Sequence, residues 1–131
     1  MVKEFNVRTN SRIEFINIDN HVLKAVSESG VQEGQCIVFV PHTTAGVTIN
    51  ENADPDVRRD INTHLNKLIP SSGDYFHAEG NSDGHIKSSL IGQSLTLIVS
   101  NGKPVLGTWQ SVFFCEFDGP RTRSVIIRVS S

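Results

Sequence analysis

SLTLIVSNGKPVLGTWQSVFFCEFDGPRTRSVIIRVS, residues Ser94–Ser130, is the stretch that decides the fold class. It holds three apolar runs, which are separated by Asn101-Gly102 and by Asp118-Gly119-Pro120. An Asn-Gly pair between apolar runs is a strong signal for a β-hairpin, and the second group is typical of a turn. The last third of the chain is therefore predicted to be an antiparallel β-meander, with Trp109 as a core aromatic side chain.

Four more strands are predicted upstream of this meander. Ile13 and Phe15 alternate with polar residues, which is the pattern of a half-buried strand. The run CIVFV, which ends at Pro41, is continuously apolar and favours a strand that is covered on both faces. The four expected strands span residues 3–7, 12–18, 36–40 and 46–49.

Two longer helices are predicted between these strands. The first begins at Asp19, and Gly30 supplies a C-terminal stop. In the second, Asp54 is a good N-cap and Pro55 fits the first helical position, where its missing N–H costs nothing. An apolar stripe at helical spacing then runs to Pro70, which ends the helix.

A long polar segment, Ser71–Gly84, follows the second helix and shows no periodicity. Irregular connections of this length tend to be functional or disordered. A short helix over residues 85–90 closes the segment, with Asp83 as a possible cap and Gly92 as a stop. Strands thus outnumber helices, and we expect an α+β fold with two main helices and one short one.

Composition excludes several classes of protein. The 131 residues fit one domain, residues 1–131, and the 37% hydrophobic and 20% charged shares are ordinary for a globular chain. A net charge of -2 without a basic stripe argues against a nucleic-acid partner. No apolar run could cross a bilayer and no export signal is present, so we expect no membrane association and a cytoplasmic location. Cys36 and Cys115 stand singly in apolar runs and are predicted to be buried, reduced thiols.

Three histidines in polar segments are the candidate metal ligands. His42 follows an apolar strand, His77 lies in the long loop, and His85 stands where that loop ends. Neutral imidazoles bind divalent metal ions, and a reactive site leaves one position open for water or substrate. We therefore expect a zinc or magnesium ion, although three separate surface histidines would give the same sequence pattern.

Acidic, amide and basic side chains accompany the histidines. Glu51 and Asp83 are candidate bases, and Lys87 could reach an anionic group. Asn50 and Asn81 are candidate substrate-binding residues. The alternatives are simpler, since Asp83 could only cap the short helix and Glu51 could only face water.

Arg121 and Arg123 follow the Asp118-Gly119-Pro120 turn and are expected on one face of the last strand. Guanidinium groups in that arrangement could hold a phosphate or a carboxylate. Equally, they could form ion pairs with Glu116 or with another subunit. No phosphate-binding loop, nucleophile elbow or dinucleotide fingerprint occurs anywhere in the sequence.

Several of these strings together resemble the YjbQ family. The resemblance rests on HTTAGVTINENAD (42–54), on the helix with its LIP ending, on YFHAEGNSDGHIKSSLIGQS (75–94) and on GTWQSVFFCEFDGPR (107–121). These strings stand in the family's order and cover most of the chain. Gly84 and Ser88 stand where the family more often has alanine, and we expect them to loosen the short helix.

The resemblance implies more than the residues do by themselves. It implies an α+β, antiparallel β-sandwich-like subunit that assembles as a homotrimer, with the polar motifs near subunit boundaries. It also implies a secondary thiamine-phosphate synthase activity, in which a pyrimidine diphosphate is joined to a thiazole phosphate and pyrophosphate leaves. Lys87, Arg121 and Arg123 are then the expected partners of the leaving diphosphate.

The leading hypothesis is a metal-binding enzyme acting on small phosphorylated or otherwise anionic metabolites, with transfer of that kind as its named reaction. A second hypothesis is metal-assisted hydrolysis, because an open coordination position beside a carboxylate also activates water. A third is a trimeric module that binds a metabolite without catalysis.

Overall fold

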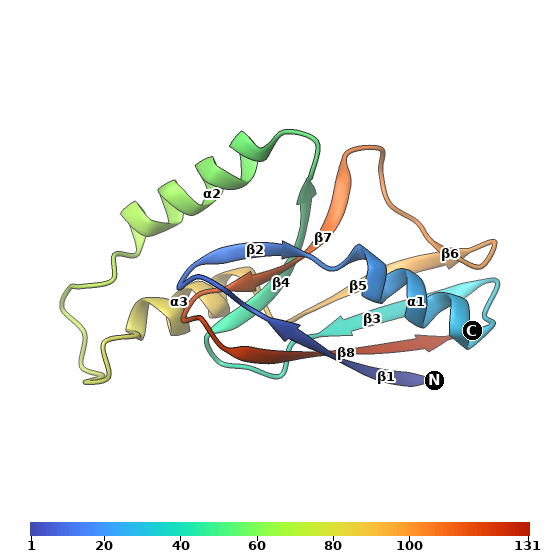
Figure 1. Cartoon of the computed structure of the whole chain (residues 1–131), viewed down its shortest axis with the longest axis horizontal. Helices are drawn as coiled ribbons and strands as arrows, with labels where there is room; N and C mark the ends of the chain where they lie inside the picture. The colour runs from blue at the N-terminus through green and yellow to red at the C-terminus, as the bar shows by residue number, and fades with distance from the viewer.

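Eight strands and three helices make up the fold, and the computed structural model describes all residues, 1–131 (Figure 1). The predicted α+β class is confirmed. In chain order the elements are β1 (Val2–Arg8), β2 (Glu14–Asn17), α1 (Asp19–Ser29), β3 (Gly34–Phe39), β4 (Ala45–Glu51), α2 (Pro55–Leu68), α3 (Ser82–Ile91), β5 (Ser94–Ser100), β6 (Lys103–Pro104), β7 (Gln110–Glu116) and β8 (Thr122–Ser130).

The strands form two antiparallel sheets. The larger sheet has the order β1-β8-β3-β5-β6 and the smaller one has the order β2-β7-β4. The prediction of one C-terminal meander is wrong, because β7 pairs with β2 and β4 while β5 and β8 flank β3. The segment from 105 to 109 carries the chain from one sheet to the other, and the turn after β7 carries it back (Figure 1).

The main core lies on the inner face of the larger sheet. Val38 and Ile127 are fully buried there, and Phe114 of the smaller sheet and Val22 of α1 pack into the same cluster. β3 was expected to be covered on both faces, but Ile37 is 37% exposed and Phe39 is 42% exposed. Antiparallel strands alternate their side chains between two faces, and nothing in the single chain covers the outer one.

The helices begin and end largely where the sequence predicts. Gly30 ends α1 with a φ of 71°, and Asp54 caps α2 by accepting a hydrogen bond from the Asp56 backbone N–H at 2.9 Å. α3 begins at Ser82, three residues before the predicted start. Asp83 does not cap it, because Asp83 lies inside the first turn and is fully buried.

The hairpin turn and the cysteines are confirmed, whereas Trp109 is not a core residue. Asn101 has a φ of 52° and Gly102 a φ of 73°, as the turn between β5 and β6 requires. Cys36 and Cys115 are buried free thiols, and burial raises the pKa of Cys36 to about 11. Trp109 is 63% exposed because it precedes β7, outside the core. None of the three helices has both the length and the apolar character needed to cross a membrane.

Candidate functional site

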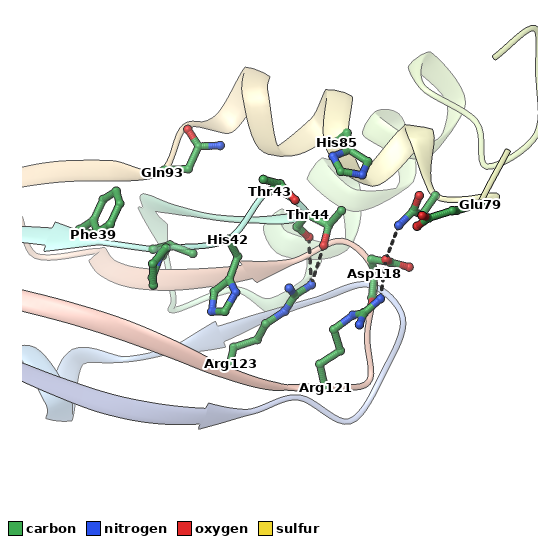
Figure 2. A pocket seen from close by; sticks show the side chains of 13 residues that line it. Phe39, His42, Thr43, Thr44, Glu79, His85, Gln93, Asp118, Arg121 and Arg123 are labelled. Atoms are coloured by element: carbon green, nitrogen blue, oxygen red, sulfur yellow. Dashed lines mark hydrogen bonds and ion pairs between the residues drawn. The ribbon is translucent and has the colours of Figure 1, made fainter. Parts of the chain in front are cut away.

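A polar cleft of about 760 Å³ lies where β3 ends, β8 begins and α3 starts (Figure 2). His85 projects into it from α3, and Arg121 and Arg123 enter from the opposite side. The lining residues come mainly from three segments, the end of β3 with the turn after it, the start of α3, and the turn before β8. They are Phe39, Val40, Pro41, His42, Thr43, Thr44, Glu79, Asn81, His85, Gln93, Asp118, Arg121 and Arg123.

Arg123 is the most buried charged side chain in the wall of the cleft, with 5% of its surface exposed. Its Nε donates to Glu116 Oε1 at 2.9 Å, and its Nη2 donates to Glu116 Oε2 at 2.5 Å and to Thr44 Oγ1 at 2.9 Å. Nη1 makes no hydrogen bond in the chain. Two N–H groups of a fixed guanidinium therefore have no hydrogen-bond partner in the chain.

Glu116 holds this guanidinium from a position with no exposed surface. Its carboxylate also accepts from Thr9 Oγ1 at 2.8 Å and from the Asp118 backbone N–H at 3.0 Å. Burial by itself raises the pKa of Glu116, but the hydrogen bonds from Arg123, Asp118 and Thr9 outweigh burial and lower it. Glu116 is thus a carboxylate at neutral pH and neutralises Arg123.

Arg121 is fixed in a similar way at the turn before β8. Its Nε donates to the Asp118 backbone oxygen at 2.8 Å, and its Nη2 donates to Asp118 Oδ2 at 2.9 Å. Asn81 Nδ2 donates to the same carboxylate oxygen at 2.8 Å. Nη1 of Arg121 again makes no hydrogen bond in the chain. Both guanidinium groups therefore use Nε and Nη2 for structure and keep Nη1 free.

His42 reaches the cleft with one ring nitrogen already engaged. Its Nε2 accepts a hydrogen bond from the Ser124 backbone N–H at 2.9 Å. Burial is the main reason that the pKa of His42 is lowered, and the positive charge of Arg123 lowers it further. A neutral ring whose Nε2 is an acceptor carries its proton on Nδ1, so neither nitrogen is free to bind a metal ion.

His77 and His85 do come together, with their ring centroids 5.3 Å apart and the rings edge to face. His77 Nε2 also lies 3.6 Å from Glu79 Oε2, on the exposed side of the loop. No group of three histidine, cysteine, aspartate or glutamate side chains in the chain could hold a metal ion. The three imidazoles of one chain therefore do not fit the ligand set that the sequence suggests.

Asp83 and Lys87 lie next to the cleft but not in its lining, one turn apart on the buried side of α3. Asp83 Oδ2 accepts from Lys87 Nζ at 3.2 Å, and Arg12 Nη2 donates to Asp83 Oδ1 at 2.9 Å. Lys87 Nζ also donates to Asn66 Oδ1 at 2.6 Å. Burial alone raises the pKa of Asp83, but the bonds from Arg12 and Lys87 outweigh it and lower that pKa. Asp83 and Lys87 thus form a buried ion pair within α3, and their bonds with Arg12 and Asn66 tie α3 to the rest of the chain.

Asn50 and Glu51 do not line the cleft either. They stand at the end of β4, opposite Ser111 and Gln110 of β7. Asn50 Oδ1 accepts the Glu51 backbone N–H at 2.7 Å. Of the substrate-binding candidates, Asn81, Arg121 and Arg123 are brought together and Asn50 is not.

Sequence reasoning missed several groups in and beneath the cleft. Thr44, Gln93 and Asp118 line it, and Glu116 lies behind Arg123. Asp118 was interpreted only as a turn residue, and Glu116 was named only as one possible partner of the arginines. The signal for Glu116 was its place inside an apolar strand, because a carboxylate is rarely buried without a partner.

The chain is similar throughout its length to proteins of one family. The family model described as "UPF0047 protein YjbQ-like" matches residues 3–131. UPF0047 protein MJ1081 of Methanocaldococcus jannaschii is 52% identical over 129 residues, which cover 98% of this chain and 94% of that protein. UPF0047 protein YugU of Bacillus subtilis is 45% identical over 130 residues, and these cover 98% of both chains.

Solved structures agree with this similarity. A crystal structure of an uncharacterised conserved YjbQ/UPF0047 family protein from Clostridium acetobutylicum matches with a TM-score of 0.96 at 56% identity, and it covers 98% of this chain and 99% of that one. A protein of unknown function from Sulfolobus solfataricus, described as YbjQ-like, matches with a TM-score of 0.94 at 30% identity, covering 98% and 95%. The chain therefore belongs to the UPF0047, YjbQ-like family.

Proposed function

We propose that the cleft binds a small phosphorylated or otherwise anionic metabolite and that the chain is an enzyme acting on it. The observation that carries this proposal is that Arg121 and Arg123 line the same cleft and that Nη1 of each makes no hydrogen bond in the chain. Guanidinium N–H groups bind phosphate and carboxylate oxygens strongly, and fixed ones lose little entropy on binding.

The charges around the arginines bear on which anions would fit. Arg123 is neutralised by Glu116 and Arg121 by Asp118, and Glu79 adds one more carboxylate at the rim. An anion would therefore bind through directed N–H groups more than through net positive charge. If a cation accompanied the anion, the carboxylates of Asp118 and Glu79 would neutralise part of its charge. Carboxylate oxygens are ligands that suit magnesium.

The divalent metal ion remains a proposal, with His77 and His85 as its ligands from this chain. Further ligands would have to come from the bound metabolite or from a second copy, because His42 Nε2 already accepts the Ser124 N–H. Elemental analysis of the native protein and of His77→Ala and His85→Ala tests this. We expect both variants to lose bound metal and His42→Ala to keep it. Stoichiometric metal in both His77→Ala and His85→Ala would exclude these ligands.

The reaction that family resemblance implies is transfer of the thiamine-phosphate synthase kind, in which a diphosphate leaves. The two Nη1 groups would stabilise the negative charge on the departing diphosphate. His85 is the imidazole in the lining that would transfer a proton. Hydrolysis of a phosphoester would use the same groups with water as the acceptor. The two reactions are separated by measuring turnover of phosphoesters, amides and lactones with and without the second substrate of a transfer. Hydrolysis proceeds without that second substrate, whereas transfer requires it.

Anion binding itself is tested by calorimetry with pyrophosphate. We expect Arg121→Gln to weaken binding about tenfold or more, which corresponds to the loss of one charge-assisted contact. Arg59→Gln, an exposed arginine of α2, is the matched control and should bind as the native protein does. Equal affinity in Arg121→Gln and the native protein would contradict the proposed site.

A binding module without catalysis is the second candidate, and one observation favours it. Asp83 and Lys87 neutralise each other in the interior, and Glu51 lies outside the lining of the cleft. The three side chains that sequence reasoning assigned to chemistry are therefore not placed to contact a ligand in the cleft. If Glu51→Gln leaves both turnover and metabolite binding unchanged, Glu51 has no part in either function.

A homotrimer is proposed together with this site. The outer face of the larger sheet exposes Ile37, Phe39 and Ile98, and Phe39 also lines the cleft. A neighbouring copy on this face would cover apolar surface and close one side of the cleft. Small-molecule metabolites and a second copy of the chain are thus the partners that we propose.

A further inference from the structure

A second pocket, of about 370 Å³, lies between the loop from 74 to 77 and the first turns of α3. Its exposed walls are mainly apolar and come from Tyr75, Phe76 and Ile86, and Asp74, His77 and Ser82 also line it. Neither the arginines nor Asp118 of the polar cleft reach it. The two pockets therefore differ in the kind of chemical group that they would accept.

His85 is the one residue that lines both pockets. On one side, His85 borders the polar cleft that contains Arg121 and Arg123. The other side contacts the apolar pocket, where the His77 ring meets it edge to face with centroids 5.3 Å apart. A molecule that fills both pockets must pass this imidazole.

The apolar pocket is open to solvent, and the chain does not fill it. The Tyr75 hydroxyl donates to the Pro70 backbone oxygen at 2.5 Å, which fixes the ring at the back of the loop. Phe76 is fully exposed and Ile86 is 40% exposed, so both keep apolar surface in contact with water. Covering that surface with an apolar group of a ligand is favourable by the usual hydrophobic effect.

We propose that the ligand of this protein has two parts, an anionic group bound between Arg121 and Arg123 and an apolar group of about the size of a phenyl ring bound against Tyr75, Phe76 and Ile86. The link between the two parts passes His85. This inference rests on the proposed function, since it assumes an anion in the cleft. It adds a second binding site and names the ligand class as a small amphipathic anion.

Calorimetry with three probes tests the inference: inorganic phosphate, propyl phosphate and 3-phenylpropyl phosphate. The two esters carry the same anionic group and the same link and differ only in the phenyl ring. We expect 3-phenylpropyl phosphate to bind roughly tenfold more tightly than propyl phosphate, because part of a ring leaves water. Ile86→Ser and Phe76→Ser should remove most of this difference and leave the affinity for propyl phosphate unchanged.

Leu23→Ser, an exposed apolar residue of α1, is the control and should keep the tenfold difference. Thermal midpoints of all variants check that they are folded. If none of the three probes binds, the proposed function fails. If propyl phosphate and 3-phenylpropyl phosphate bind equally well, the proposed function stands and this inference is wrong. The inference is also overturned if Ile86→Ser changes the size of the assembly but not the ratio of the two affinities, because a neighbouring copy then fills the pocket.

Discussion

Arg123 and Glu116 show how a buried pair can fix a guanidinium group and still leave one of its nitrogens, Nη1, without a partner in the chain. Each partner satisfies the other, and Thr44 takes the remaining bond on Nη2. A buried pair of this kind adds little net stability compared with apolar residues of the same size. What the pair does here is fix the orientation of the Arg123 guanidinium group in the wall of the cleft, with Nη1 left unpaired.

The pH dependence of stability should report on Glu116. Its pKa in the folded chain is below the ordinary value of 4.5, so the unfolded chain binds more protons in that range. The contribution of the carboxylate is therefore fully present above pH 4.5 and is lost as the pH falls through the folded pKa. Urea unfolding at a series of pH values down to 3 should show this loss.

Glu116→Gln should lower the free energy of unfolding at pH 7 by about 3 kcal/mol, because it leaves Arg123 buried without a counter-charge. The same substitution should remove the Glu116 part of the acid dependence. Glu79→Gln, an exposed carboxylate at the rim, is the control and should change neither quantity. If the free energy of unfolding of Glu116→Gln falls at low pH as steeply as that of the native protein, the acid dependence does not come from Glu116.

The tautomer of His42 is a second prediction at the scale of one residue. Nitrogen NMR at pH 7 should find Nε2 without a proton and Nδ1 with one, because Nε2 accepts the Ser124 N–H. Since burial and Arg123 lower the pKa, the ring should titrate below 6.5. A titration midpoint at or above 6.5 would show that the ring is not held in this way.

Sequence reasoning could name cleft residues that stand in local polar groups, such as Arg121 with Arg123, and Asn81 with His85. It could not tell that Asp83 and Lys87 are buried. Their burial depends on Arg12 and Asn66, which lie 71 and 21 positions away from their respective partners. Charged residues in a polar segment normally face water, and only long-range partners reverse that expectation.

At the scale of elements, local signals predicted α1, α2 and the hairpin between β5 and β6. Capping side chains, Pro55 and the Asn101-Gly102 pair act within a few residues, so they can be recognised in the sequence. The assignment of β7 to a separate sheet could not be recognised. The choice between one meander and two sheets depends on β2 and β4, which are far from β7 along the chain.

Gly84 and Ser88 hold α3 close to its neighbours, contrary to the expectation that they loosen it. Ser88 Oγ donates to the Ala45 backbone oxygen at 3.0 Å, which ties α3 to β4. A Cβ atom on Gly84 would lie 2.9 Å from the Phe117 backbone oxygen. The absence of a side chain at Gly84 is what lets α3 approach the strand end so closely.

Gly84→Ala should therefore destabilise the protein, although alanine favours helices by up to about 1 kcal/mol over glycine. The contact with a backbone oxygen requires α3 or the Phe117 segment to move, and we expect the thermal midpoint to fall by several degrees. Ser89→Ala at an exposed position of α3 is the control and should change it little. A higher midpoint in Gly84→Ala would show that helix propensity outweighs the close contact.

At the scale of the whole molecule, the open outer face of the larger sheet should govern assembly. Sedimentation of the native protein should give the mass of a trimer. Ile98→Lys places a charge on this face, where Ile98 is 67% exposed, and should produce monomers. Leu23→Lys on α1 should remain a trimer, because α1 covers the opposite face of the same sheet. A native monomer, or an unchanged mass in Ile98→Lys, would contradict the proposed assembly.

α2 has 14 residues, none of which is buried, and it rests on the smaller sheet through Leu65 and through Arg58 above the Phe113 ring. Its Asn66 also accepts a hydrogen bond from Lys87 of α3. Detaching it would expose little apolar surface and would leave both sheets intact. Hydrogen–deuterium exchange should therefore find its amides opening at a much lower free energy than those of β3 and β8. A protease that cuts only such transient openings would nick the chain within α2 first and leave the rest folded.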